Sequence, residues 1–370
     1  MQRRISVVLP CLDEERTVAA CVEEARRGVE ALGAEPEVVV VDNGSRDGSV
    51  GAAGAAGARV IAERRRGYGF ALWRGIREAT GDVILLGDAD GSYRFDDLGP
   101  LVAAADAGAD LVMGSRLRGR IERGAMPWLH RHVGTPVLTK LVNVLFRARI
   151  SDVNCGQRAL RREAVERLDL RAGGMEFASE MVIKAALAGL RIADVPVDFR
   201  RDRRDRPPHL RTWRDGWRHL RFLLLFAPNL VLLAPGAAFL LFGAFLAGPS
   251  LIGREGLGWA RPFTGAAFVL LGAQLVQVGL IAKTWYHVEG FYRRPYMDRL
   301  FRYVGLETGL LLGLGLLAVG VVTGVPLVEQ WREALPADPG RIASAITFLA
   351  LGAQVIASSV ILSVLGIRRR

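Results

Sequence analysis

The sequence predicts an α/β domain with a mostly parallel sheet, followed by an all-α membrane domain of four helices. In the first 221 residues, short apolar runs of strand length alternate with segments of helical periodicity, as in β-α-β units. The valines at 38–41 do not alternate with polar residues, which suits a parallel strand covered on both faces. After residue 222 the chain contains four long apolar runs, each close to the ~20 residues that cross a bilayer.

The expected strands are short and end in polar or turn-forming residues. They cover residues 5–9, 37–41, 60–61, 83–86, 111–113 and 192–199. The expected helices lie between them, the first ending near residue 32 and the others covering 52–57, 69–80, 96–107, 128–146 and 174–188. In parallel sheets of this kind, ligands bind beyond the carboxyl ends of the strands.

Two carboxylates follow the apolar strand at 83–86. Asp88 and Asp90 are one residue apart, so in an extended segment both side chains point to the same side. Paired oxygen donors suit a hard cation such as Mg²⁺ or Mn²⁺, which would in turn hold a phosphate. Taken alone, the segment is equally consistent with a polar turn after a strand.

Further polar residues follow the other strands. These are Asp13, Glu14, Asp42 and Arg116. Each alone is an ordinary solvated turn residue, but together they place acids and one arginine at the ligand-binding edge. The glycines at 67, 69 and 75 are a weak match to a dinucleotide fingerprint, since no acidic partner follows at the expected spacing. We expect this loop and helix start, with the arginines at 64–66, to lie near phosphates.

Four segments together resemble the ordered motifs of glycosyltransferase family 2. They are PCLDEE at 10–15, VDNGS at 41–45, GYGFA at 67–71 and DAD at 88–90. The resemblance spans the first 220 residues and is strongest to the polyprenyl-phosphate branch, that of dolichol-phosphate mannose and glucose synthases. It implies a nucleotide-sugar transferase (GT-A type) fold, with a metal held by Asp88 and Asp90 and with Asp42 near the base. The nucleotide-binding residues that the resemblance implies are Pro10, Leu12, Glu14, Val41, Asp42, Asp88, Ala89 and Asp90.

The segment SDVNCGQR at 151–158 resembles the family segment that lines the sugar and acceptor pocket. With it, the expected catalytic residues are Asp88, Asp90, Arg116, Asp152 and Arg158. Glu176 and Glu180 share a helix face and fit either contacts to sugar hydroxyls or pairing with arginines.

Two positions depart from the family pattern. Asp13 stands where many relatives have Asn, and Ser92 stands where mannose synthases often have Gln as a further metal ligand. The sugar and the nucleotide therefore stay open.

A dense basic segment at 200–221 precedes the first apolar run. Such a run is usually a solvated face, but it resembles the family's juxtamembrane segment, which implies contacts to a lipid phosphate from Arg200, Arg204, Arg206, His209 and Arg211. Trp213 and Trp217 are one helical turn apart, as suits an interfacial anchor. The helix at 128–146 fits either ordinary packing or a position on the membrane.

The expected organisation is a cytoplasmic glycosyltransferase domain (1–210), a juxtamembrane interfacial helix (211–226) and a membrane domain (227–370). The expected spans are about 227–247, 263–282, 304–325 and 342–367. Arginines gather in the loop at 283–302 and at 368–370, so the positive-inside rule places the catalytic domain and both termini in the cytoplasm. Cys11, Cys21 and Cys155 have no metal-ligand spacing and fit a reducing compartment.

The function expected from these features is inverting transfer of a hexose from a nucleotide sugar, of the UDP-glucose or GDP-mannose type, to polyprenyl phosphate. The expected cofactor is Mg²⁺ or Mn²⁺. The net charge is +11, and much of the arginine is concentrated just before the first apolar run, so we expect the lipid bilayer and not nucleic acid as a partner. The alternatives are a processive membrane polysaccharide synthase and a nonenzymatic nucleotide-sensing membrane scaffold; a homo-oligomer is left open.

Overall fold

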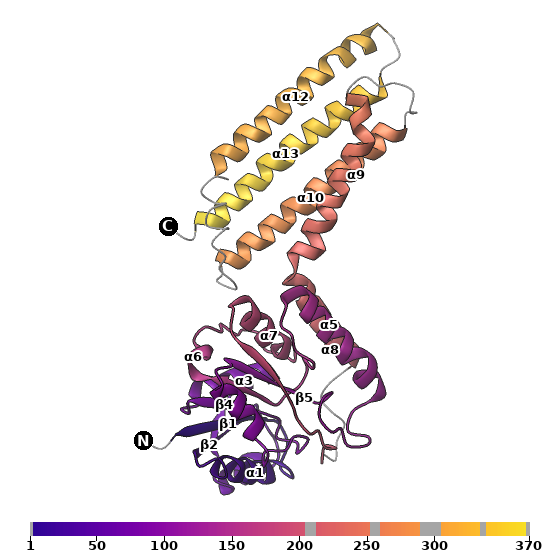
Figure 1. Ribbon diagram of the computed structural model, residues 1–370. Coiled ribbons are helices and arrows are strands. Elements are labelled where there is room, and N and C mark those ends of the chain that lie inside the picture. The colour runs from indigo at the N-terminus through magenta and orange to yellow at the C-terminus, as the bar shows by residue number, and fades with distance from the viewer. Residues whose placement is uncertain (1–2, 204–211, 252–259, 289–304, 334–337, 368–370) are drawn as a thin grey trace. The chain divides into compact units, whose positions relative to one another are not determined.

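The computed structural model describes residues 3–203, 212–251, 260–288, 305–333 and 338–367. The chain forms two compact units, Met1–Leu223 and Leu224–Arg370 (Figure 1). The first unit contains the sheet and its covering helices, and the second consists of long helices.

The first unit is built on a seven-stranded sheet with the order β3-β2-β1-β4-β6-β5-β7. The strands are β1 (Arg4–Cys11), β2 (Glu35–Asp42), β3 (Arg59–Ala62), β4 (Val83–Leu86), β5 (Leu111–Ser115), β6 (Arg158–Arg161) and β7 (Ile192–Pro196). Strand β6 is antiparallel to both of its neighbours, and the other neighbouring pairs are parallel. The predicted mostly parallel α/β sheet is therefore confirmed.

Helices connect the strands of this unit. They are α1 (Val18–Glu30), α2 (Ser49–Ala55), α3 (Tyr68–Glu78), α4 (Gly99–Asp106), the π-helical turn η1 (His130–Gly134), α5 (Thr135–Phe146), α6 (Arg162–Val165) and α7 (Phe177–Leu187). A further helix, α8 (Thr212–Leu225), leads into the second unit. The predicted helix at 128–146 is present as η1 and α5.

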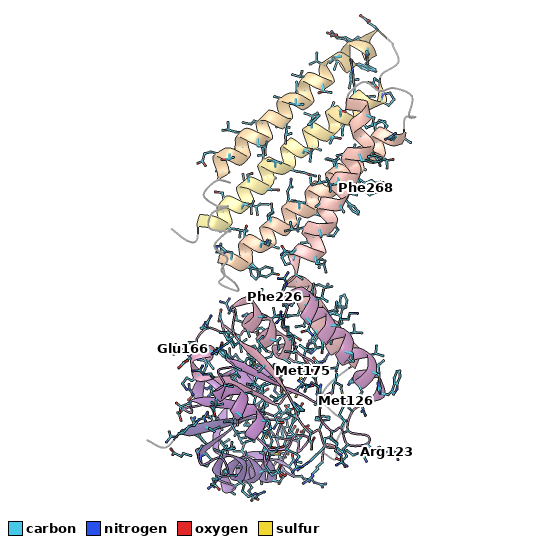
Figure 2. All side chains as sticks on the ribbon, in the orientation of Figure 1. Arg123, Met126, Glu166, Met175, Phe226 and Phe268 are labelled. Carbon is cyan, nitrogen blue, oxygen red and sulfur yellow. The ribbon has the colours of Figure 1, made fainter. Side chains whose placement is uncertain are left out.

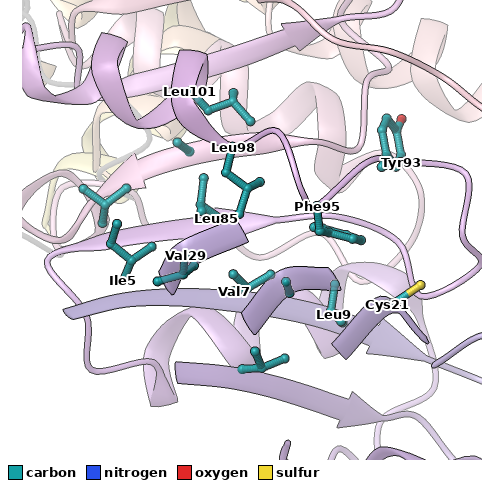
Figure 3. Close-up of a cluster of buried hydrophobic side chains, with 14 of the residues drawn as sticks. Ile5, Val7, Leu9, Cys21, Val29, Leu85, Tyr93, Phe95, Leu98 and Leu101 are labelled. Carbon is teal, nitrogen blue, oxygen red and sulfur yellow. The ribbon is translucent and has the colours of Figure 1, made fainter. Parts of the chain in front are cut away.

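The core explains why β1 is apolar at successive positions. Val7 and Leu9 belong to a buried cluster that includes side chains of α1 and α4 (Figure 3). On the opposite face of the sheet, Gly75 of α3 lies so close to β1 that an added Cβ would be 2.3 Å from Val8 Cγ1. Both faces are thus covered by helices, which removes the polar alternation of a half-exposed strand.

Strand β6 was not predicted from the sequence. Its four residues, RALR, begin and end in arginine, so the segment has only two apolar residues in a row and no apolar run of strand length. The structure accommodates the first of these charges because the Arg158 guanidinium donates to backbone carbonyls in the interior. Two of these acceptors are near in sequence and the third, Ala178 O, belongs to α7, so the composition of the segment does not reveal that its arginine is buried.

The second unit contains four helices long and apolar enough to cross a membrane, Asn229–Pro249, Ala260–Val288, Leu306–Arg332 and Pro339–Gly366. The elements are the π-helical turn η2 (Asn229–Leu233) with α9 (Ala234–Leu251), α10 (Ala260–Val288), α12 (Leu306–Arg332) and α13 (Pro339–Ile367). The predicted four spans are confirmed, with ends that differ from the expected ones by up to seven residues.

Small residues let these helices approach closely. A Cβ on Gly272 of α10 would lie 2.7 Å from Gly236 O of α9, and one on Gly313 of α12 would lie 2.9 Å from Gly352 O of α13. Phe268, labelled in Figure 2, packs its ring edge-on against α9 aromatics. The α10 and α13 helices are also joined by a hydrogen bond from a serine of α13 to a glutamine of α10.

Candidate active site at the carboxyl ends of the strands

Asp88 and Asp90 follow β4 and are each oriented by a hydroxyl donor. The Tyr68 hydroxyl donates to Asp88 Oδ1 at 2.9 Å. The Ser92 hydroxyl and the Ser92 backbone N–H donate to Asp90 Oδ1 at 2.6 and 2.9 Å. Burial and the nearby Asp88 carboxylate raise the pKa of Tyr68 well above its usual value, so its hydroxyl is protonated at neutral pH.

Gly156 provides the space beside the first carboxylate. A Cβ at this position would lie 2.7 Å from Asp88 Oδ2 and 3.1 Å from the Tyr93 ring. The Gly156 N–H donates to the Tyr93 hydroxyl oxygen at 2.7 Å, which fixes the backbone here. The segment 151–158 therefore reaches the carboxylates through a residue that has no side chain.

Loops from two other strands join this region. The Thr17 hydroxyl, after β1, donates to Ala89 O at 2.7 Å. Asn43, after β2, donates to Glu63 O at 3.0 Å and accepts from the Gly67 N–H at 2.7 Å. These bonds link the end of β1 to the end of β4, and the end of β2 to the segment that follows β3.

The residues predicted to bind the nucleotide lie on these strand ends. They are Pro10 at the end of β1, Leu12 and Glu14 after it, Val41 and Asp42 at the end of β2, and Ala89 between the two aspartates. The Asp42 carboxylate accepts from the Gly44 and Ser45 N–H groups, which closes the turn after β2. The structure brings this set together at one edge of the sheet, and its part in nucleotide binding stays a prediction.

Arg116 and Asp152 form a buried ion pair at the end of β5. Arg116 Nε and Nη2 donate to the two Asp152 oxygens at 2.7 and 3.0 Å, and Asp152 is fully buried. Although burial by itself acts to lower it, the pKa of Arg116 is raised well above its usual value by negative groups that include Asp152. Asp152 also accepts from two backbone N–H groups, so it anchors the 152–154 turn.

Arg158 is held by the interior of the domain. Its guanidinium donates to Cys155 O, Ala178 O and Val153 O at 2.8, 2.8 and 3.0 Å, and 2% of the residue is exposed. These bonds tie β6 to the start of α7. They give Arg158 a structural task beside any catalytic one.

The two glutamates left open by the sequence are now distinguished. Glu180 is buried and pairs with Lys184 at 2.8 Å, and it accepts from the backbone N–H groups of residues 171 and 172. Glu176, at the start of α7, keeps one buried oxygen with no hydrogen-bond partner among the described residues. Of the two alternatives, pairing with a basic residue therefore applies to Glu180, and its partner is Lys184 instead of an arginine.

Of the residues predicted to bind the lipid phosphate, Arg200 is described. Its guanidinium pairs with Glu24 at 3.2 Å, and its N–H donates to Ser92 O at 2.8 Å. The backbone N–H of Arg203 donates to Asp90 O at 3.2 Å. Residues 200–203 therefore lie along the loop after β4 that carries Asp88 and Asp90. Arg204, Arg206, His209 and Arg211 lie outside the described residues.

The aspartates fit a hard divalent cation in part. Carboxylate oxygens are the donors that Mg²⁺ and Mn²⁺ prefer, and Asp88 Oδ2 lies beside Gly156, which has no side chain to cover it. Within the described ranges, no group of three or more His, Cys, Asp or Glu side chains is suited to hold an ion. A cation bound by Asp88 and Asp90 therefore needs further ligands, such as phosphate oxygens or water.

Tyr68 is the site residue that sequence reasoning missed. The loop around it was expected near phosphates, but its bond to Asp88 was not foreseen. The sequence does show a tyrosine between two glycines at the start of a predicted helix. It does not show where the side chain points, because that depends on how both glycines pack against the backbone of residues 172–173.

Two family models match this chain. "Glycosyl transferase family 2" matches residues 6–169, and "Glycosyltransferase family 2 C-terminal transmembrane region" matches residues 280–366. The chain is 35% identical to the low-salt glycan biosynthesis hexosyltransferase Agl6 of Haloferax volcanii, over 98% of this chain and 89% of that protein.

Two further similarities are shorter. A dolichyl-phosphate hexose transferase of the same organism is 30% identical over 53% of this chain and 82% of that protein. A crystal structure of glucosyl-3-phosphoglycerate synthase from Mycobacterium tuberculosis, in complex with Mn²⁺, UDP and glucosyl-3-phosphoglycerate, is 25% identical. It covers 61% of this chain and 80% of that one, with a TM-score of 0.46.

A mostly parallel α/β sheet, followed along the chain by four apolar helices, defines an integral membrane protein with a nucleotide-sugar-transferase type of domain. Its similarity to the Haloferax hexosyltransferase extends over nearly the whole length of both proteins. The chain belongs to glycosyltransferase family 2. The resemblance seen in the sequence motifs is thereby confirmed.

Proposed function

We propose that this protein transfers a hexose from a nucleotide sugar, of the UDP-glucose or GDP-mannose type, to polyprenyl phosphate with inversion at the anomeric carbon. The observation that carries the proposal is the pair Asp88 and Asp90, oriented by hydroxyl donors at the sheet edge of a membrane protein. The names of two relatives, a hexosyltransferase and a dolichyl-phosphate hexose transferase, support the sugar and acceptor classes.

The donor's diphosphate binds at Asp88, Ala89 and Asp90 in this proposal. Mg²⁺ or Mn²⁺ held by the two carboxylates would neutralise the charge of the departing diphosphate as a Lewis acid. The nucleoside lies between the ends of β1 and β2, where Asp42 accepts hydrogen bonds. The residues assigned to it are Pro10, Leu12, Glu14, Val41 and Asp42.

The acceptor needs positioning more than activation. A phosphate monoester is already an anionic nucleophile at neutral pH, so transfer requires alignment and exclusion of water and no general base. Guanidinium groups suit this task because they bind phosphate oxygens in a bidentate way. The cations assigned to the acceptor are Arg116, Arg200, Arg204, Arg206, His209 and Arg211, with Asp152 orienting Arg116.

A surface of the first unit supports a lipid acceptor. Trp128, Val133, Val137 and Val144 are exposed around η1 and α5. No Asp or Glu occurs from residue 123 to 151, whereas six Arg, Lys or His side chains lie between 130 and 149 and more basic residues flank them. An apolar face with a basic surrounding suits an interface with anionic lipid.

A pocket of about 440 Å³ beside α5 lies on the same surface. It is lined by Leu117, Pro136, Lys140 and Val144 among others, and Ser151, which precedes Asp152, completes it. A cation within a mostly apolar lining suits a chain with a charged end. We assign the first isoprene units of the acceptor to this pocket.

The proposed placement in the cell follows the charge of the loops. The catalytic domain and both termini face the cytoplasm, because the basic loop at 283–302 and the basic C-terminus stay on that side. The proposed organisation is a catalytic domain at 1–210, an interfacial helix at 211–226 and a membrane domain at 227–370.

The test is transfer from radiolabelled UDP- and GDP-hexoses to polyprenyl phosphate, with Mg²⁺, Mn²⁺ or chelator. We expect one chloroform-soluble, acid-labile product that is lost with chelator. Asp90→Asn should lower the rate by about 100-fold or more, because it removes a ligand that stabilises the leaving diphosphate. Asp97→Asn, an exposed change seven residues on, is the matched control and should leave the rate unchanged.

The outcomes separate the alternatives. A long carbohydrate product would identify a processive synthase in place of a lipid-phosphate transferase. Binding of a nucleotide sugar with no product from any donor would identify a nonenzymatic role. Unchanged transfer by the Asp90→Asn variant would overturn the assignment of the site.

A further inference from the structure

Tyr68 is the first residue of α3, and its hydroxyl reaches the carboxylate at the end of β4. The bond to Asp88 Oδ1 is 2.9 Å long and joins residues twenty positions apart. A hydroxyl donor on one oxygen limits rotation of the carboxyl group, so the second oxygen keeps one direction. For Asp88 that oxygen is Oδ2, which faces the space left by Gly156.

The same arrangement occurs at the second aspartate. The Ser92 hydroxyl donates to Asp90 Oδ1, as the Tyr68 hydroxyl does to Asp88 Oδ1. The two hydroxyl donors differ in their distance along the chain from the aspartate that accepts their hydrogen bond. Ser92 is two residues from its acceptor, whereas Tyr68 is presented by another helix and needs a separate support.

Two glycines hold Tyr68 in place. The Gly69 N–H donates to Gly173 O at 3.0 Å. A Cβ on Gly69 would be 2.1 Å from Ala172 O, and one on Gly67 would be 2.1 Å from Gly173 O. The backbone on both sides of Tyr68 is therefore packed directly against the backbone of 172–173.

That second backbone is itself held by buried charge. The Glu180 carboxylate accepts from the N–H groups of Arg171 and Ala172 at 2.8 to 3.0 Å. Lys184 pairs with the same carboxylate at 2.8 Å, and Glu180 is 1% exposed. A continuous set of contacts thus leads from Glu180 to Tyr68 and on to Asp88.

We propose that Tyr68 is a positioning residue for the divalent cation, which it serves by holding the Asp88 carboxylate so that Oδ2 faces the cation. This inference rests on the proposed function, in which Asp88 and Asp90 bind the cation. Residues that hydrogen-bond metal ligands typically change metal affinity by 10–100-fold when they are removed. The role is indirect, since the tyrosine acts through the aspartate.

The test is Mn²⁺ binding to the full-length protein in detergent, with UDP and in a parallel series with GDP, monitored by the electron paramagnetic resonance signal of free Mn²⁺. Tyr68→Phe keeps the ring and removes the hydroxyl, and we expect the Kd for Mn²⁺ to rise by about 10-fold or more. Tyr286→Phe is the matched control, because it removes a tyrosine hydroxyl that bonds to Leu225 O in the other unit. Its Kd should equal that of the unchanged protein.

Gly69→Ala is a second probe, since it disturbs the support and keeps the hydroxyl. It should also raise the Kd, and the thermal midpoint of each variant shows whether the fold is retained. A folded Tyr68→Phe protein that binds Mn²⁺ as tightly as the unchanged protein would overturn the positioning role alone. If Asp90→Asn leaves the Kd unchanged, or the unchanged protein does not bind Mn²⁺, the proposed metal site fails and the positioning role fails with it.

Discussion

Arg116, Asp152 and Arg158 show how residues predicted together acquire different tasks. All three were expected to be catalytic, Arg116 from its place after a predicted strand and Asp152 and Arg158 from the 151–158 segment. In the structure, Arg116 and Asp152 form a two-point ion pair, and Arg158 donates to three backbone carbonyls. Each residue therefore contributes to stability, and a test of function has to separate stability from activity.

Asp152→Ala should destabilise the protein by about 3–5 kcal/mol, because it leaves the buried Arg116 without its partner. Unfolding by denaturant, followed by far-UV circular dichroism, measures this change. The double variant Arg116→Met/Asp152→Leu should recover part of the loss, since it removes both charges but also the acceptor of two backbone N–H groups. A cost below about 1 kcal/mol for Asp152→Ala would show that the pair is solvated.

Gly156→Ala should lower transfer without unfolding the protein. The added methyl group would lie 2.7 Å from Asp88 Oδ2, so the carboxylate has to turn away from the position proposed for the cation. We expect a loss of about 10–100-fold in the rate, as for other changes that reorient a metal ligand. Gly124→Ala, where nothing lies within 4 Å, is a control for the measurement, although its positive φ adds strain.

At the scale of elements, the sheet shows what local pattern specifies. The apolar runs of β1, β2 and β4 were recognised because both of their faces are covered by helices. Strand β6 was missed because the burial of its first residue, Arg158, depends on hydrogen bonds to backbone carbonyls that include Ala178 O of α7. Its antiparallel direction likewise follows from the path of the chain between β5 and α7.

Glu37 of β2 joins several elements and makes stability depend on pH. It accepts from Ser6 of β1, from Thr80 after α3 and from Arg59 of β3. Although burial acts to raise it, the pKa of Glu37 is lowered overall by these hydrogen bonds. Because the folded pKa lies below the unfolded value of about 4.3, the stabilisation is present above that pH and is lost as the pH falls through the folded pKa.

Glu37→Gln should therefore cost about 1–3 kcal/mol at pH 7, and the difference from the unchanged protein should shrink below about pH 4.3. Thermal unfolding across pH 7 to 3 measures it. Glu35→Gln, which removes an exposed carboxylate of the same strand, is the matched control and should change the thermal midpoint little. If the difference in thermal midpoint between Glu37→Gln and the unchanged protein stayed constant with pH, the ionised Glu37 carboxylate would not be the source of the stabilisation.

At the scale of the whole molecule, the chain unites a soluble type of fold with long helices, whose backbone hydrogen bonds are made mostly within each helix. The helices of the second unit expose many large apolar side chains, which is stable only in a bilayer or against a partner of similar character. Their mutual packing relies on glycine contacts, because lipid provides no hydrophobic drive for helices to associate.

The orientation can be tested with cysteines, because the three native ones are buried. A cysteine appended to the C-terminus should react with a membrane-impermeant maleimide only after intact cells are opened. Glu333→Cys, at the exposed end of α12, should react from outside in intact cells. The reverse pattern would place the catalytic domain outside the cytoplasm.

The sequence by itself determined the α/β class, the four spans, the paired aspartates and the family, because these depend on local periodicity, on length and on short motifs. Tertiary structure alone decided the direction of β6, the pairing of Arg116 with Asp152 and the bond from Tyr68 to Asp88. These features join residues that are distant in the chain, and their geometry depends on which backbones lie close enough to exclude a side chain. Contacts of that kind leave no periodic trace in a single sequence.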